Sequence, residues 1–320
     1  MSTLVAQAPA QTRASRALAF IGGFHLWMAL AISTLLIISL AGCALTGIKL
    51  PDLGAWAIIS LVLSAMLLPL PAYWYEKGRA DLLDCALTLL WSLLIKLIIP
   101  ILVQVAVRLR MPLQDSFFGR SDEHLGVSVP AIMAWANHHW LGSMLNKSYA
   151  WVVILLPLAV LLPMLAGKLK YAKEFLAANL ISFAIGIPLF ALLPAIGPWH
   201  YFHFPPSEAQ TTFCEAPLLA MRLAGTYVLG SQEAGVVCFP SFHVAWAIFF
   251  AAALWGFRWL RIPVAVVSGM VILSTMTTGW HYFVDVLGGI LLAVISIVLA
   301  KRLTQRTETI RHSRSGPLAP

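Results

Sequence analysis

Two short groups of polar residues stand at the borders of apolar segments in the C-terminal third of the chain. In one of them His281 and Asp285 are four residues apart, so on a helix they share a face. A carboxylate beside an imidazole holds the ring in one tautomer and leaves the other nitrogen free as a nucleophile or base. A buried pair that merely packs helices has the same spacing, so this motif alone leaves both interpretations open.

The other group contains Pro240, Ser241 and His243 at the start of an apolar run. Pro and Ser suit the first turn of a helix, where free N–H groups and the positive end of the dipole favour an anion. The two apolar segments that follow are expected to form a hairpin, which returns His243 and His281 to the same membrane face. One imidazole would then attack phosphorus while the other protonates the leaving oxygen. The pattern therefore predicts a phosphoryl-transfer site at one face of the membrane.

The composition explains why these residues must be positioned by membrane helices. Of 320 residues, 60% are hydrophobic and only 11% are charged, with a mean hydropathy of +0.85. A soluble domain has about a quarter of its residues charged. The apolar residues fall in long runs, which must be helical because a bilayer offers no partner for free backbone groups. The sequence predicts an all-α, polytopic membrane helix bundle.

About eight transmembrane helices are expected, since about twenty apolar residues cross a bilayer. They are placed at 18–42, 54–73, 83–107, 149–166, 174–196, 242–257, 263–280 and 283–300. We divide the chain into a cytoplasmic N-terminal tail with two additional helices (1–80), a six-helix catalytic core (81–302) and a disordered cytoplasmic tail (303–320).

The formal charge of +8 would suggest nucleic acid for a soluble protein. Here the basic residues gather at the ends of apolar runs on the side of the N-terminus, which the positive-inside rule explains, and no nucleic acid partner is expected. The segments 108–148 and 197–241 then face outside. Within the first, 129–145 is predicted to be an interfacial helix because its polar residues sit mid-run. In the second, Cys214 and Cys238 either form a disulfide or remain free.

A family resemblance rests on Pro240-Ser241-Phe242-His243 and on His281-Tyr282-x-x-Asp285. These resemble the second and third signature motifs of the type 2 phosphatidic acid phosphatase superfamily, Pro-Ser-Gly-His and Ser-Arg-x5-His-x3-Asp. The resemblance implies that His281 forms a phosphohistidine, that Asp285 orients it and that His243 is the general acid. It implies no metal and no other cofactor.

The chain departs from that pattern in informative ways. Ser274 and Thr275 occupy the Ser-Arg positions, so the phosphate-binding Arg is absent, and no Lys-x6-Arg-Pro motif occurs. Phe242 replaces the motif's Gly. With the His281-Tyr282 pair, these changes resemble the inositol phosphorylceramide synthase branch, whose members move a phosphorylated headgroup from one lipid to another acceptor. The stretch 194–199 is similar to the Pro- and Trp-rich segment of that branch.

Other groups must replace the missing Arg as phosphate or substrate contacts. The candidates are Pro240, Ser241, Phe242, Tyr282, Arg222, His200 and Trp199. Arg222 is equally typical of a charge that faces solvent or headgroups, and His200 of an interfacial side chain. Lys96, within the third predicted span, is expected to pair with a polar group of the bundle or to reach the interface.

The sequence thus predicts a lipid phosphatase or phosphotransferase that acts on a lipid phosphate or a phospholipid headgroup donor. We expect it in a bacterial inner membrane among membrane lipids, with its active site on the extracytoplasmic face; its oligomeric state is left open. The alternative is a transporter or channel in which the His and Asp residues relay protons or bind an ion. Depth separates the two, since phosphoryl transfer needs the headgroup level. A degenerate lipid-binding scaffold is a third hypothesis, against which the intact His, His and Asp set argues.

Overall fold

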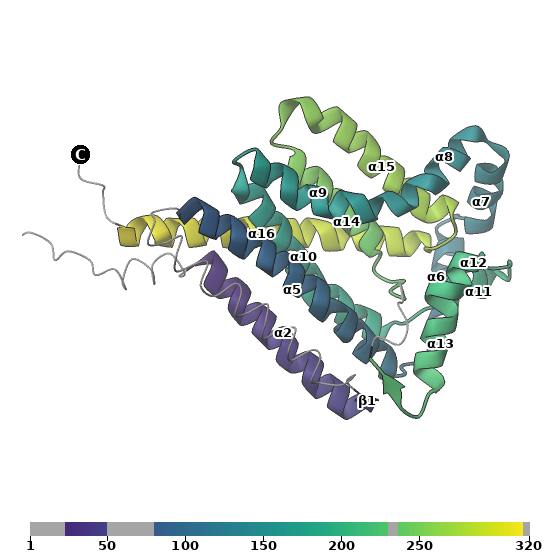
Figure 1. Ribbon diagram of the computed structural model, residues 1–320. Helices are drawn as coiled ribbons and strands as arrows, with labels where there is room; N and C mark the ends of the chain where they lie inside the picture. The colour runs from purple at the N-terminus through teal and green to yellow at the C-terminus, as the bar shows by residue number, and fades with distance from the viewer. Residues whose placement is uncertain (1–22, 50–79, 230–235, 316–320) are drawn as a thin grey trace, which may run out of the picture.

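Long apolar helices that lie side by side make up most of the molecule (Figure 1). The structure is a computed structural model that describes residues 23–49, 80–229 and 236–315. The long helices of the bundle are α2 (Phe24–Thr46), α5 (Ala80–Arg108), α9 (Val152–Leu165), α10 (Leu169–Leu192), α14 (Phe242–Leu254), α15 (Arg261–Thr277) and α16 (Phe283–Ser315). The prediction of an all-α membrane bundle is confirmed.

Shorter elements gather at one end of the bundle, on the right of Figure 1, which we call the site end. They are α6 (Asp115–His124), α7 (Val129–His138), α8 (Trp140–Ser148), α11 (Pro198–Phe202), α12 (Glu208–Gln210), a π-helical turn (Thr211–Glu215) and α13 (Ala216–Leu223). Two-residue parallel strands, β1 (Ile48–Lys49) and β2 (Tyr227–Val228), join the end of α2 to the segment after α13. Single 3-10 turns precede α9 (Tyr149–Trp151) and α15 (Arg258–Leu260).

Six helical stretches among the described residues are long and apolar enough to cross a membrane, and α14 is a shorter apolar helix of 13 residues. Together they account for seven of the eight predicted spans. The predicted span at 54–73 lies outside the described residues. Large apolar side chains such as Leu30, Val153 and Ile262 are exposed on these helices, as a lipid-facing surface requires.

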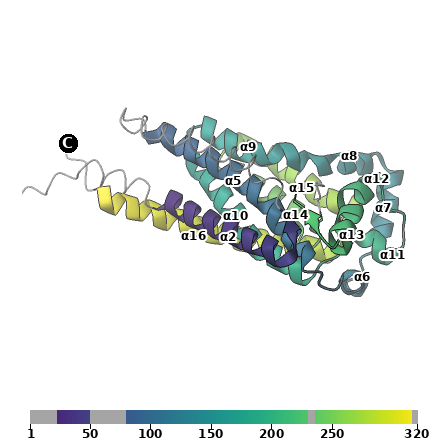
Figure 2. The same ribbon diagram turned by 60° about the horizontal axis from the view of Figure 1, so that its bottom comes forward.

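The predicted interfacial helix at 129–145 is wrong. The backbone at His139 is extended (φ −125°, ψ 139°), which ends α7, and α8 begins at Trp140. A methyl group at Gly142 would overlap the backbone of Ala136, so this glycine lets α8 fold back closely on α7. Helices α8 and α9 follow one another along the top of Figure 2 and together form one candidate span, Trp140–Leu165. This crossing starts at Trp140 and thus earlier than predicted, and α7 adds no further candidate span.

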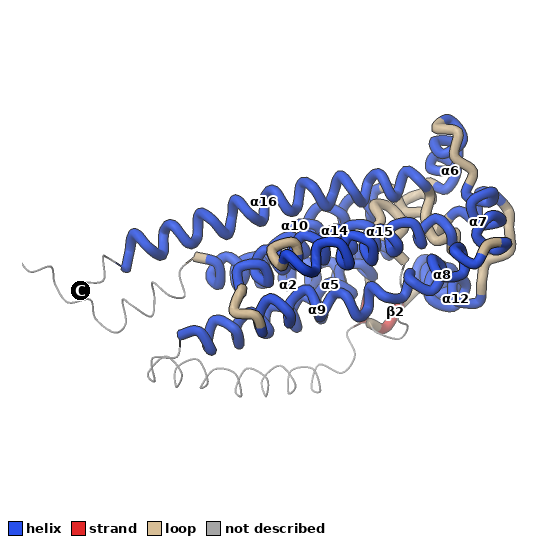
Figure 3. Tube along the Cα trace, turned by 90° about the horizontal axis from the view of Figure 1, so that it is seen from above, coloured by secondary structure: helices blue, strands red, loops and turns tan. Residues whose placement is uncertain are grey.

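Helix α16 is also longer than predicted. It runs from Phe283 to Ser315 and therefore continues through most of the segment 303–320 that the sequence predicts to be disordered. Figure 3 shows it as the longest helix along one edge of the bundle, with α6 and α7 lying beyond its start. Helix α10 packs against α5, α9, α14 and α16 and is the most buried of the spanning helices.

A buried polar cluster ties the N-terminal helix to the bundle at the end opposite the site. Asp84 of α5 contacts His25 Nε2 of α2 at 2.8 Å and Lys173 Nζ of α10 at 2.6 Å. Trp91 Nε1 donates to His25 Nδ1 at 2.9 Å, so His25 carries its proton on Nε2 and donates it to Asp84. At the site end Arg108 donates to the carbonyls of Thr46, Met221 and Gly225. Both contacts satisfy charges that would otherwise be costly inside an apolar bundle.

Candidate active site

His281 lies in the turn between α15 and α16, one helical turn before Asp285. Its Nδ1 is 3.1 Å from the backbone oxygen of Cys238 and 3.5 Å from Asp285 Oδ2. A carbonyl oxygen only accepts hydrogen bonds, so Nδ1 carries the proton and Nε2 keeps its lone pair. The His ring is thereby held in the tautomer that a nucleophile needs.

Asp285 is fully buried and is held by groups from two segments. Its Oδ2 accepts from the backbone N–H of Tyr282 at 2.9 Å and from the Cys238 thiol at 3.0 Å. Burial raises the pKa of Cys238, so the thiol stays protonated and acts as the donor. The sequence did not identify Cys238 as part of the site. Among the described groups, Asp285 Oδ1 has no hydrogen-bond partner.

His243, in the first turn of α14, faces His281 with ring centroids 6.0 Å apart. Tyr149 stacks on His243 at 4.1 Å and its hydroxyl lies 3.4 Å from Nδ1 of that histidine. Tyr149 also stacks on Trp280, with ring centroids 5.6 Å apart. This aromatic stack fixes the plane of the His243 ring, so the two imidazoles meet at one place as the sequence predicts.

Both histidines open onto a cavity of about 610 Å³. This volume lies in the range of sites that bind small molecules. The lining comes from α5, α10, α14 and the loops of the site end: Lys96, Ile99, Pro100, Val103, Gln104, Tyr149, Phe183, Ile196, Cys214, Val236, Val237, Cys238, Phe242, His243, Trp246, Trp280 and His281. The walls are mostly apolar, and Lys96, Gln104 and Tyr149 are among the few polar side chains that line them beside the histidines.

Two aspartates of α6 fix the backbone around this site. Asp122 accepts from the backbone N–H groups of Phe283 (2.7 Å) and Val284 (3.0 Å), the first residues of α16. Asp115 accepts from the N–H groups of Ile196 (3.0 Å) and Gly197 (2.9 Å). The N–H groups at the start of a helix have no partner within the helix, and a carboxylate can accept their hydrogen bonds. Helix α6 therefore holds the backbone at the start of α16. His281 and Asp285 lie within two residues of this start.

Burial raises the pKa of Asp122 to about 6. The two backbone hydrogen bonds lower it and the nearby Asp285 charge raises it, but desolvation is the largest contribution. Asp122 therefore titrates close to the pH range of ordinary assays. It does so at the start of α16, the helix that carries Asp285.

The predicted residues of α14's first turn lie beside the histidines. Ser241 is fully buried, and its hydroxyl accepts from the Val244 N–H as the N-cap of α14. Phe242 lines the cavity, and its ring fills the space over Gly186 of α10. Pro240 is buried in the loop immediately before them. This turn brings one predicted residue, Phe242, to the cavity wall next to His243.

Three other predicted residues belong to the frame of the site. Tyr282 is fully buried, and its hydroxyl lies 3.0 Å from Asp115 and 2.9 Å from the Gly197 oxygen. Trp199 donates to Glu215 at 3.2 Å and packs edge-on against Trp280. His200 is exposed, with Nδ1 3.7 Å from Asp115.

Arg222, the remaining candidate, donates to the Met111 backbone oxygen at the edge of α13. Neither Arg222 nor His200 is among the described residues that line the cavity.

Of the two alternatives left open for Cys214 and Cys238, the structure has both cysteines free and buried. Cys214 contacts the Ile196 oxygen, and burial raises its pKa to about 12. The ligand-type atoms of Cys238, His281 and Asp285 lie within 4.8 Å of one another, which is the spacing of a three-ligand metal site. In this structure the same atoms are engaged in the hydrogen bonds described above.

A comparison of the sequence with known protein families finds a match that contains these histidines. A sequence model of the PAP2 superfamily matches residues 117–299, more than half of the chain. The chain belongs to the PAP2 superfamily. Neither a search of curated proteins nor a search of solved structures finds a match.

Membership of the PAP2 superfamily supports a phosphatase-like membrane enzyme. The matched segment starts within α6 and ends in α16, so it contains His243, His281 and Asp285 but neither α2 nor α5. Two lining residues of the cavity that carry polar side chains, Lys96 and Gln104, are on α5 and thus outside the PAP2 match.

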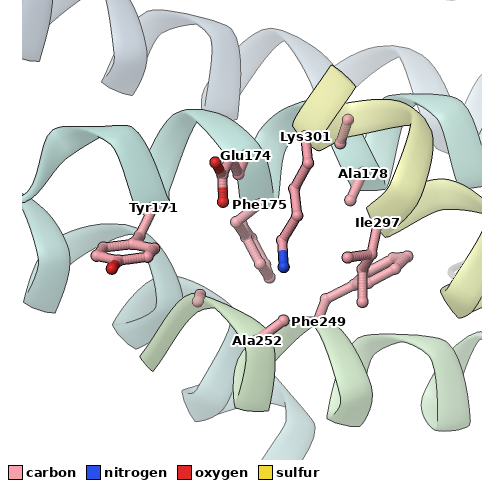
Figure 4. Close-up of a pocket in the computed structure, with 10 residues that line it drawn as sticks. Tyr171, Glu174, Phe175, Ala178, Phe249, Ala252, Ile297 and Lys301 are labelled. Carbon is pink, nitrogen blue, oxygen red and sulfur yellow. The ribbon is translucent and has the colours of Figure 1, made fainter. Parts of the chain in front are cut away.

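A second, much smaller cavity of about 20 Å³ lies toward the opposite end, between α10, α14 and α16. Figure 4 shows the Lys301 side chain extending between residues of α10 and α14, with Glu174 and Phe249 nearby. Such a volume holds about one water molecule. The cavity of about 610 Å³, which holds both His243 and His281, is the candidate active site.

Proposed function

We propose that this PAP2 superfamily protein cleaves a phosphoester of an amphiphilic substrate through a phosphohistidine on His281. The observation that carries the proposal is the orientation of the His281 ring. Its Nδ1 is occupied by the Cys238 carbonyl and Asp285, while the ring also borders a cavity shared with His243. An imidazole held this way presents Nε2 as the nucleophile.

In the first half-reaction the Nε2 lone pair of His281 attacks phosphorus, and the bond from phosphorus to the leaving oxygen breaks. His243, as the imidazolium, gives that oxygen a proton and becomes neutral. Asp285 stabilises the positive charge that develops on the His281 ring. In the second half-reaction His243 removes a proton from the attacking water or alcohol, its oxygen bonds to phosphorus, and the P–N bond electrons return to Nε2.

Transfer of a phosphorylated headgroup to an alcohol acceptor is the finer form of this proposal. It rests on the resemblance to the inositol phosphorylceramide synthase branch. Ser274 and Thr275 bond to the backbone oxygens of Val271 and Ile272, one turn earlier in their own helix, and are fully buried. The volume of about 610 Å³ has room for a headgroup together with a small acceptor. The substrate would be a lipid phosphate or a phospholipid headgroup donor that enters from the bilayer.

We place the active site on the extracytoplasmic face of a bacterial inner membrane. Eight basic residues of the described part gather at the end opposite the site, in the turns after α9 and α14, in the first turns of α10 and α15 and along α16: Lys168, Lys170, Lys173, Arg258, Arg261, Lys301, Arg302 and Arg306. Such residues accumulate on the cytoplasmic side of membrane proteins.

The test is phosphate release and radiolabelled headgroup transfer by the purified protein on a panel of lipid phosphates and phospholipids. We expect His281→Ala to abolish turnover and His243→Ala to lower it by about 10²–10⁴-fold. His124→Ala, at an exposed histidine of α6 away from the cavity, is the matched control and should behave as wild type.

A labelled, acid-labile phosphoprotein should form in the wild type and not in His281→Ala, and chelators should leave turnover intact. Full activity of His281→Ala would refute the mechanism. If no phosphate or headgroup donor reacts, and proteoliposomes instead show a proton or ion flux that depends on His281, the transporter alternative takes its place.

A further inference from the structure

One face of α5 forms a wall of the active-site cavity. Lys96, Pro100 and Gln104, four residues apart in sequence, line the cavity together with Ile99 and Val103. Residues at this spacing form a single stripe on a helix. Since α5 precedes the segment that matches the PAP2 superfamily, the family's own motifs do not account for this stripe.

Lys96 is the only Lys or Arg among the described residues that line the cavity. It lies within the candidate span Leu82–Arg108, and no salt bridge or hydrogen bond joins it to another described residue. A cation inside a membrane helix is costly and typically marks a substrate or ion pathway when it faces a cavity in the bundle interior. Lys96 thus lines the cavity that holds both histidines, and none of the residues that the structure describes forms an ion pair with it.

Gln104 is the second unusual member of the stripe. Its side chain is 7% exposed, and its Oε1 is buried without a hydrogen-bond partner among the described residues. Leaving a buried acceptor unsatisfied costs about 1–3 kcal/mol. A ligand that donates a hydrogen bond from a hydroxyl or N–H group would remove this cost when it fills the cavity.

We propose that α5 recognises the polar headgroup of the substrate, with Lys96 binding the phosphate charge and Gln104 Oε1 accepting a hydrogen bond from a headgroup hydroxyl. Lys96 then supplies the positive charge that no Arg provides at Ser274 and Thr275. Eight residues of helix separate the Cα atoms of Lys96 and Gln104 by about 12 Å, so a ligand that contacts both side chains needs a hydroxyl at some distance from its phosphate, which a bare phosphate lacks. This inference rests on the proposed function for the identity of the substrate.

The experiment measures equilibrium binding of radiolabelled short-chain phosphatidic acid and phosphatidylglycerol to detergent-solubilised protein. The wild type and the His281→Ala background are both used, because the latter separates binding from turnover. We expect Lys96→Gln to weaken binding of both lipids by about tenfold or more, the effect of losing one charge-assisted hydrogen bond, while Lys96→Arg stays close to wild type. Lys147→Gln, at an exposed lysine outside the cavity lining, is the control.

Gln104→Leu should weaken binding of phosphatidylglycerol, which carries headgroup hydroxyls, and leave phosphatidic acid unaffected. The inference is overturned if Lys96→Gln binds both lipids as the wild type does, or if the wild type shows no saturable binding of either. Saturable, Lys96-dependent binding without any turnover would instead sustain this inference and refute the proposed chemistry. Turnover that is lost in His281→Ala but unchanged in Lys96→Gln would support the proposed chemistry and overturn this inference about α5.

Discussion

Replacing Asp122 by alanine tests whether α6 positions the catalytic helix. The carboxylate accepts from the N–H groups of Phe283 and Val284, the first two residues of α16, and its side chain is fully buried. Asp122→Ala removes both acceptors and leaves two donors unsatisfied at the helix start. His281 lies only two residues before this point, so the change should act on activity as well as on stability.

The magnitude follows from the two lost contacts. Loss of an N-cap acceptor costs about 0.5–2 kcal/mol, and each buried donor left without a partner about 1–3 kcal/mol. Part of this is offset, because burial already disfavours the Asp122 carboxylate, as its raised pKa indicates. We therefore expect Asp122→Ala to cost about 2–4 kcal/mol of unfolding free energy. Asp122→Asn keeps one acceptor oxygen and should cost about half as much.

Thermal unfolding in detergent gives the stability of each variant, and phosphate release gives the turnover number. Glu123→Ala is the matched control, since Glu123 is the next residue of α6, is exposed and only accepts from the Tyr201 hydroxyl. The expected order of stability is wild type and Glu123→Ala, then Asp122→Asn, then Asp122→Ala. An Asp122→Ala protein as stable as the wild type, or a Glu123→Ala protein that loses as much, would refute the assigned role of α6.

Three further outcomes are expected. Because the pKa of Asp122 is raised to about 6 in the folded state, protonation of this carboxyl adds a component of stability that is fully present below about pH 4 and is lost as the pH rises through 6, apart from the two hydrogen bonds to α16; the pH dependence of thermal unfolding should lack this component in Asp122→Asn. A methyl group at Gly119 would overlap the Tyr201 ring, so Gly119→Ala should destabilise the contact of α6 with α11 by about 1–3 kcal/mol, seen as a lower melting temperature. Mass spectrometry of the unreduced, denatured protein should find free thiols at both Cys214 and Cys238, and a peptide pair linked through them would contradict the structure.

The sequence identified the features that depend on local spacing and composition. Long apolar runs predict membrane helices because nothing else satisfies the backbone in lipid. The His281 and Asp285 pair lies within one helical turn, and the short hairpin between α14 and α15 returns His243 to it. Helix geometry alone suffices for these residues, so their proximity was predictable.

Other features depend on contacts between distant segments and carry no local signal. Asp122 and Asp115 resemble ordinary polar residues of an outer loop until α6 is placed against residues 283 and 196. Lys96 is a lone charge in an apolar run, and only the packing of α5 against α10 brings it to the wall of the cavity that also holds the histidines. The break at His139 was missed because composition does not reveal that α8 must turn back on α7.

The spacing of the two α6 carboxylates has a consequence for how this protein tolerates change. Asp115 and Asp122 are seven residues apart, two turns on one face, and their backbone partners are main-chain N–H groups at 196–197 and 283–284. These bonds use the main chain of the partner residues, so they do not depend on the chemical type of the partner side chains. Adding or deleting one residue between the carboxylates would rotate them about 100° apart. Variants of this protein therefore have to preserve the number of residues between Asp115 and Asp122, while the types of the residues between them matter less for these bonds.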